Sequence, residues 1–132
     1  MTDSPTSAPQ GYVPGVCNIG PDERRQRRLF GLVSGGIAVV LFAFLLATNA
    51  ARPWRFLIFF PVAGAAIGIL QDRLHFCAGY GFRGVANVFS PAGETEDVTS
   101  AEFRRQDQRK ALQIIGLSAA VGAVITALAF VI

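Results

Sequence analysis

The sequence contains one histidine, one lysine and two cysteines, and this scarcity excludes several classes of protein. A bis-histidine haem site would need a second histidine, which the chain lacks. His75 is the only histidine that a serine-histidine-acid triad could contain. No pair of carboxylates in the sequence suggests acid-base catalysis. We therefore expect no catalytic residue, no cofactor and no enzyme activity from this chain alone.

Charged residues are absent from long stretches of the chain. Hydrophobic residues make up 52% of the sequence, and the mean hydropathy is +0.42. Residues 29–48 and 114–132 contain no charge at all, whereas a soluble helix would interleave charges to keep one face wet. A bilayer core about 30 Å thick needs roughly 20 apolar residues in a helix. Both stretches therefore predict transmembrane helices.

A third apolar stretch, residues 56–70, is short for a complete span. Pro53 and Trp54 precede it, and Arg55 can extend its side chain toward lipid headgroups. We therefore expect a transmembrane helix over residues 53–72, with a re-entrant hairpin as the alternative. None of the three stretches holds an ionisable residue, which proton-coupled transporters usually need at mid-membrane depth.

The basic residues are distributed unequally between the two sides of these spans. Ten of them flank the first and third spans on one side, and only Arg52 and Arg55 lie on the other. Because cytoplasmic loops are enriched in Lys and Arg, we expect the N-terminus inside a bacterial cytoplasmic membrane and the C-terminus outside. The first 20 residues have no apolar core of a cleavable signal peptide. The ten residues are Arg24, Arg25, Arg27, Arg28, Arg73, Arg83, Arg104, Arg105, Arg109 and Lys110.

The predicted organisation is an all-α membrane protein with five segments. Residues 1–20 read as a disordered tail, and residues 21–49 as a first helix that starts before the membrane, with Gly20 as its cap and Pro21 at its first position. Residues 53–72 form the second helix, which Pro61 is expected to kink. Residues 73–98 form a partly interfacial inner loop. Thr99 and Glu102 match a capping box, which predicts a third helix over residues 99–132.

Small residues recur four positions apart in every span. Association of helices in lipid depends on close van der Waals contact, which small residues permit. We therefore expect these positions to pack helices together, within the chain, in self-association or against other membrane subunits. The candidates are Gly31 with Gly35, Gly64 with Gly68, and Gly116 with Ala120 or Ser118 with Gly122.

The net charge of +3 and the isoelectric point near 9.4 are explained by contact with lipid rather than with nucleic acid. The residues expected at the headgroups are Arg24, Arg25, Arg27, Arg28, Trp54, Arg55, Tyr80 and Arg83. The last two belong to residues 79–84, which match G-x-G-x-x-G. That fingerprint binds dinucleotides only between a strand and a helix. After a membrane helix it predicts a flexible turn at the membrane surface.

Three residues offer ligands for a metal ion. Cys17, His75 and Cys77 all fall on the expected cytoplasmic side, where a structural disulfide is not favoured. Thiolates and imidazole are ligands for zinc, with Asp72 as a fourth candidate, although the spacing matches no metal knuckle.

Three functions are compatible with these patterns. The first is a non-catalytic accessory or structural subunit that packs against other membrane helices. The second is a membrane protein with a metal or redox site at Cys17, His75 and Cys77. The third is a small oligomeric channel, for which only Ser34, Ser118 and Thr126 could provide a polar lining.

Overall fold

A computed structural model describes residues 11–89, 91 and 93–132 of the chain. Most of the chain is helical, and three helical runs are long and apolar enough to cross a membrane: residues 21–47, 52–74 and 101–131. The elements in order are α1 (Pro21–Ala47), the 3-10 helix η2 (Arg52–Ile58), α2 (Phe59–Leu74), α3 (Ala78–Arg83), β1 (Val85–Ala86), β2 (Glu96–Asp97) and α4 (Ala101–Val131).

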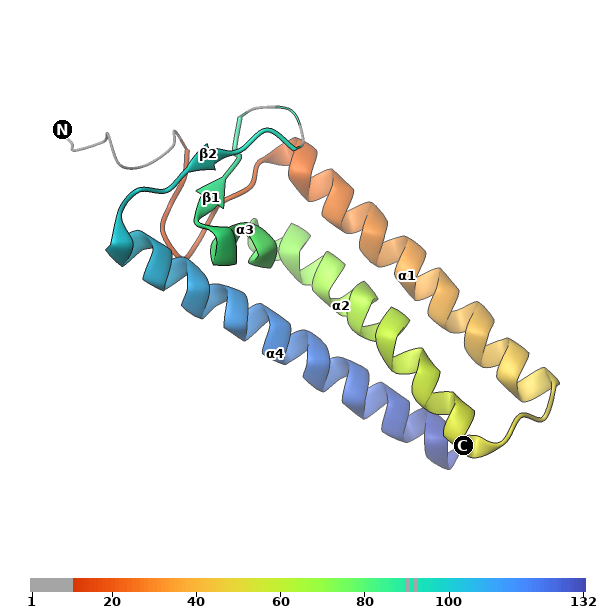
Figure 1. Ribbon diagram of the computed structural model, residues 1–132. Helices are drawn as coiled ribbons and strands as arrows, with labels where there is room; N and C mark the ends of the chain where they lie inside the picture. Colours follow the sequence, from red (N-terminus) through yellow and green to blue (C-terminus); the bar gives the residue numbers. More distant parts are fainter. Residues whose placement is uncertain (1–10, 90, 92) are drawn as a thin grey trace.

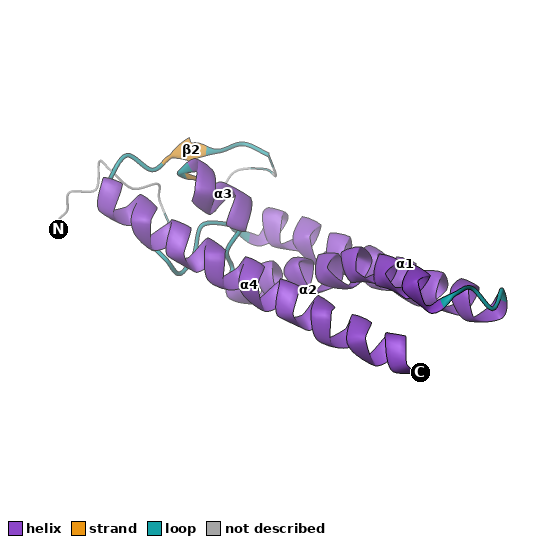
Figure 2. Cartoon of the chain, turned by 60° about the horizontal axis from the view of Figure 1, so that its bottom comes forward, coloured by secondary structure: helices purple, strands orange, loops and turns teal. Residues whose placement is uncertain are grey.

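The three long helices lie side by side with α2 in the middle (Figure 1). Helices α1 and α4 each pack along α2, and within the described residues they have little or no direct contact with each other. At one end lie the turn from α1 to η2 and the end of α4. At the other end, α3, the two short strands and the N-terminal segment gather between the starts of α1 and α4 (Figures 1 and 2).

Helix α1 begins where the sequence predicts. Pro21 occupies its first turn, and the acidic side chains of Asp22 and Glu23 lie near the positive end of the helix dipole. Gly20 precedes the helix, and a Cβ on Gly20 would lie 1.6 Å from the carbonyl oxygen of Val88. Only glycine fits there, because the chain passes directly over the segment that follows β1.

The middle helical run is longer than its apolar core suggests. It extends without reversal from Arg52 to Leu74, as 3-10 helix to Ile58 and as α-helix from Phe59. This continuous course differs from the re-entrant alternative. Pro61 lies in the first turn of α2, the part of an α-helix in which proline is best tolerated. The change from 3-10 to α-helix lies two residues before this proline, and the kink stays a prediction.

The N-terminal tail differs from the expectation of disorder over residues 1–20. Residues 1–10 lie outside the described residues, but residues 11–20 form a segment with a tight turn closed by a bridge between Val13 and Cys17, in which Tyr12, Asn18 and Ile19 are buried. Ile19 pairs with Asn87 in a parallel bridge beside β1, and β1 pairs antiparallel with β2. We refer to residues 11–20, α3, β1 and β2 together as the cap.

The inner loop is more ordered than its glycine-rich composition suggests. Residues expected to form a flexible turn form α3, which ends at Gly84 in the left-handed conformation, with φ of 70°. A Cβ on Gly81 would lie 2.9 Å from the backbone oxygen of Asp107, so glycine lets α3 pack directly on α4. The fold is therefore helical with one small two-stranded sheet, rather than purely helical.

Helix α4 starts one residue later than the capping box predicts. Ser100, not Thr99, is its N-cap, and the Ser100 hydroxyl accepts a hydrogen bond from the Phe103 amide at 3.3 Å. Adjacent Thr and Ser are both good N-caps, and the chain uses the second.

Candidate functional site in the cap

Glu23 is the centre of a buried hydrogen-bond network, with only 1% of its surface exposed. One carboxylate oxygen accepts hydrogen bonds from the Tyr80 hydroxyl, from Asn87 Nδ2 at 3.0 Å and from the Gly93 amide at 2.8 Å. The other forms an ion pair with Arg27 at 3.1 Å. Burial alone would raise the pKa of Glu23, but these donors and the Arg27 charge hold that pKa below its ordinary value.

Arg27 connects this network to the turn between α2 and α3. Its Nη2 atom lies 3.1 Å from Glu23 and donates a hydrogen bond to the Cys77 sulfur at 3.2 Å. Its guanidinium also lies over the Tyr80 ring, 5.4 Å from the ring centre. The start of α1 is thereby joined to the segment between α2 and α3.

Asp72 forms a second junction, between the end of α2 and the start of α1. Its buried carboxylate lies 3.2 Å from Arg24 Nε and 3.4 Å from Arg28 Nη1. Arg24 also donates to the backbone carbonyl of Asp72. One acidic side chain therefore neutralises part of the basic block that precedes the first span.

Asp107 holds the N-terminal segment against α4. It is completely buried and accepts hydrogen bonds from the Tyr12 hydroxyl and from the Gly15 amide, the latter at 2.8 Å. Within the described residues it forms no ion pair. Burial raises the pKa of Asp107, and the two hydrogen bonds offset only part of that effect. Burial and the contact with Asp107 also raise the pKa of Tyr12.

Two amide side chains complete the cap. Asn18 donates to the carbonyl of Cys77 at 3.2 Å and accepts from the Cys77 amide at 2.7 Å. Gln71, at the end of α2, accepts from the Ala78 amide at 2.8 Å and so caps the start of α3. These contacts fix the turn between α2 and α3, where His75 adopts the left-handed conformation.

The proposed metal ligands are not brought together. Within the described residues, no three His, Cys, Asp or Glu side chains are close enough to hold a metal ion. The Cys17 thiol donates to the Ile19 carbonyl, the Cys77 sulfur faces Arg27, and His75 is exposed. Burial raises the pKa of Cys17.

The small residues fall into two groups. A Cβ on Gly68 would lie 2.6 Å from the backbone of Gly31, and one on Gly64 would lie 3.1 Å from the Ser34 hydroxyl. Gly35 faces Ala65 more loosely. These contacts lie between α1 and α2.

On α4, Ser118 and Gly122 face α2, and a Cβ on Gly122 would lie 3.0 Å from the Phe59 ring. Gly116 and Ala120 are exposed, and a Cβ on Gly116 would meet no atom of the described chain within 4 Å. The polar residues that a channel lining would need, Ser34, Ser118 and Thr126, are buried. The second of the two α4 pairs is therefore the one in the intramolecular contact.

Several residues expected at the headgroups are used within the protein. Tyr80 is buried against Glu23, and Arg83 lies over the Tyr80 ring at 5.3 Å. Arg55 donates to the Ala129 carbonyl at 2.9 Å, at the end of α4. Arg25 and Trp54 are exposed.

The two buried carboxylates at the centres of these networks, Glu23 and Asp107, were not among the candidate site residues of the sequence, although Arg27, Tyr80, Asp72 and Cys77 were candidates for other roles. The sequence indicates that Glu23 is an acidic residue near a helix start and that Asp107 is one charge within a basic helical section. It does not indicate that either carboxylate is buried. The only local signal is that Asn18 and Asn87 each adjoin an apolar residue, Ile19 and Ala86, that is buried. Their partners are far away in the sequence, so no local spacing connects them.

Comparison with known proteins gives no further assignment. No family model matches the chain, and neither the curated proteins nor the solved structures include a match. The function must therefore be argued from the chain itself.

Proposed function

We propose that this chain is a small non-catalytic integral membrane protein, an accessory or structural subunit that packs against other membrane helices. In this proposal the chain lies in a bacterial cytoplasmic membrane. The cap and the N-terminus are inside, and the end of α4 is outside. The observation that carries the proposal is an apolar groove left open between α1 and α4.

The groove exists because α1 and α4 each pack mainly on α2, with little contact between them among the described residues. Its volume is about 400 Å³, and its lining is almost entirely apolar. Small side chains, such as those of Gly35, Ala38 and Ala65, lie along it, so another helix could approach closely. Residues that contribute from α4 include Ile125 and Ala129.

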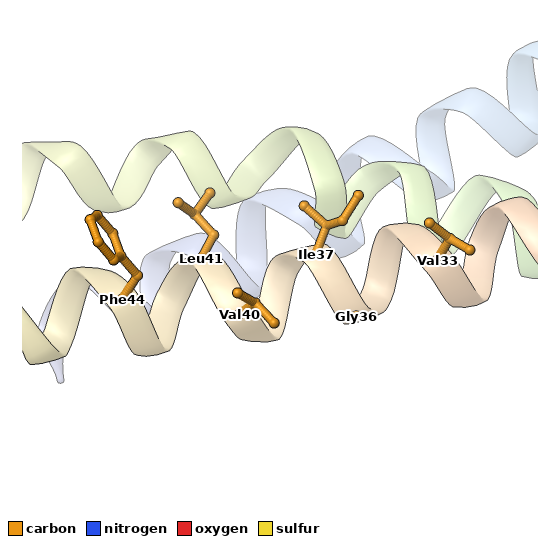
Figure 3. Close-up of a pocket in the computed structure, with 6 residues that line it drawn as sticks. All are labelled: Val33, Gly36, Ile37, Val40, Leu41 and Phe44. Atoms are coloured by element: carbon orange, nitrogen blue, oxygen red, sulfur yellow. The ribbon is translucent and has the colours of Figure 1, made fainter.

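A second apolar surface lies along α1 alone. Figure 3 shows six residues of this helix around a shallow depression of about 560 Å³, in which Gly36 provides no side chain. Val33 and Val40 on this surface are more than half exposed. In water such a surface would promote aggregation, whereas in a bilayer it faces lipid chains.

The charge distribution supports the orientation. The cap contains or adjoins most of the basic residues, whereas only Arg52 and Arg55 lie at the opposite end. A fusion of alkaline phosphatase to the C-terminus is expected to be active, and a fusion at Gly93 to be inactive. Activity at Gly93 would contradict the orientation without affecting the packing proposal.

The packing proposal is tested with a matched pair of substitutions. Val39 and Val40 are adjacent and equally exposed, at 69%, but only Val39 lines the groove between α1 and α4. We expect cross-linking in native membranes to capture a stoichiometric complex, with itself or with another membrane protein. Val39→Trp fills the groove and should abolish that complex, whereas Val40→Trp should preserve it. A monodisperse monomer without cross-links would contradict the proposal.

A further inference from the structure

A second groove, of about 560 Å³, lies where α1 and α2 leave the cap. Unlike the groove described above, it combines polar and apolar walls. Gln26, Arg27, Gln71 and Cys77 provide the polar side, and Leu29 and Phe30 provide the apolar side. Arg27 lies just before the first charge-free stretch and Gln71 just after the second. The groove therefore spans the boundary between the polar and apolar parts of the molecule.

The Gln71 amide presents an unused donor to this groove. Only 7% of Gln71 is exposed, and its Oε1 atom is held by the Ala78 amide at 2.8 Å. That contact fixes the direction of the side chain and turns the amide nitrogen away from Ala78. The nitrogen has no hydrogen-bond partner among the described residues. Gln71 lines the groove, so a ligand there can accept the hydrogen bond that the protein itself leaves unmade.

Arg27 provides a positive charge beside that donor. Its Nη2 atom is used by Glu23 and Cys77, and the guanidinium also contacts Tyr80, which leaves part of the fork of N–H groups for a further acceptor. Glu23 itself is satisfied by three further donors. A guanidinium and an amide that converge at one place suit the oxygens of a phosphate.

The apolar wall indicates that the phosphate belongs to a lipid rather than to a small soluble molecule. Leu29 is 49% exposed and Phe30 is 54% exposed, and both continue from the polar wall along α1 into the charge-free stretch. A free phosphate would leave this apolar surface uncovered. An acyl chain attached to the phosphate would cover it.

We propose that this groove binds one anionic phospholipid, with its phosphate at Arg27 and Gln71 and an acyl chain along Leu29 and Phe30. The proposal requires that the chain lies in a membrane, but not that it is a subunit of a larger assembly. It goes beyond general contact of arginines with the membrane surface, because it predicts one saturable site.

The test is native mass spectrometry of the full chain in neutral detergent. The probes are phosphatidylglycerol and phosphatidylcholine with identical acyl chains. We expect one retained phosphatidylglycerol and roughly tenfold weaker retention of phosphatidylcholine. Glycerol 3-phosphate, which lacks acyl chains, should not displace the lipid at equal concentration. Equal binding of both lipids, or displacement by glycerol 3-phosphate, would overturn the lipid assignment.

Gln71→Glu is the decisive variant. It keeps the oxygen that caps Ala78, replaces the donor with an acceptor and adds a negative charge, so binding should fall at least roughly tenfold. Arg25→Gln is the control, since Arg25 is exposed, lies outside this groove and forms no ion pair with any described residue. Wild-type binding by folded Gln71→Glu, or equal losses in both variants, would overturn the proposal.

Arg27→Gln is a second test of the same site. It should also lose the lipid, but it removes the ion pair of Glu23, so its fold is checked by circular dichroism. The outcome is independent of the Val39→Trp experiment. If the lipid proposal fails, the packing proposal is unaffected. If the packing proposal fails, the lipid proposal is unaffected.

Discussion

Gly68 lies against Gly31 so closely that a Cβ on Gly68 would be 2.6 Å from both the Cα and the backbone nitrogen of Gly31. The contact joins the backbones of α1 and α2, and neither can move aside as a flexible side chain could. It is the closest of the small-residue contacts between these two helices. Because neither glycine has a side chain, the backbones of α1 and α2 are in direct contact at this point, and this contact fixes their register.

Gly68→Ala is therefore expected to separate α1 from α2. We expect a loss of about 1–3 kcal/mol in the free energy of unfolding, because the extra methyl group overpacks a backbone contact. Unfolding in mixed micelles by a denaturing detergent measures the loss. Gly116→Ala is the control, because a Cβ there meets no atom of the described chain within 4 Å. Equal stability of both variants would contradict this account of the contact.

Arg55→Met is expected to loosen the last turn of α4. The guanidinium donates to the Ala129 carbonyl at 2.9 Å, and the last carbonyls of a helix have no helical partner. Loss of a charged donor should make opening of this turn easier by about 1 kcal/mol, or roughly fivefold faster hydrogen exchange. Exchange in α1 should not change. Unaltered exchange at the end of α4 would show that the contact contributes nothing.

Tyr12→Phe is expected to release the N-terminal segment from α4. The substitution removes one of two donors to the buried Asp107 carboxylate, at a cost of about 1–3 kcal/mol. Hydrogen exchange at the Gly15 amide, which donates to the same carboxylate, should become faster. Val16→Ala serves as a control, because Val16 is in the same segment but exposed. If Val16→Ala accelerated exchange equally, the effect would not come from Asp107.

Glu23 and Asp107 are expected to affect stability in opposite directions as the pH changes. Both lie outside the charge-free stretches. The pKa of Glu23 is lowered by folding, so its contribution is present above its ordinary pKa and is lost as the pH falls through the folded value. The pKa of Asp107 is raised, so folding favours its protonated form, and stability falls as the pH rises from its ordinary pKa through the raised one.

These opposite signs are measured by the pH dependence of unfolding in two variants. Glu23→Gln should reduce the loss of stability in acid, relative to wild type. Asp107→Asn should remove the decline that occurs as the pH rises above the ordinary pKa of aspartate. Parallel pH profiles for the two variants would contradict the different environments of these carboxylates.

The long helices were predictable because their signals are local. An uninterrupted apolar stretch, such as residues 29–48, is itself the reason for a helix in a bilayer. The Gly20–Pro21 start of α1 is equally local. The Thr99 cap was wrong by one residue because two adjacent residues have the same capping chemistry, and local spacing does not choose between them.

The cap was not predictable by the same reasoning. Tyr12 and Asp107 are 95 positions apart, and Tyr80 and Glu23 are 57 apart. Glycine-rich composition suggested flexibility at residues 79–84, but Gly81 is required by close packing of α3 on α4. The small-residue pattern showed which helices could approach, whereas the choice between Gly116 and Gly122 depends on which face of α4 meets α2.

The distance along the chain between Tyr12 and Asp107 also sets an order of assembly. The ribosome makes Tyr12 long before Asp107, so the Asp107 carboxylate is not yet present while α1 and α2 are being made. Asn18 and Cys77 can meet earlier, once α2 is complete. The contact of the N-terminal segment with α4 therefore needs only the start of the last helix, whereas the Asn18 contact needs only the turn after α2.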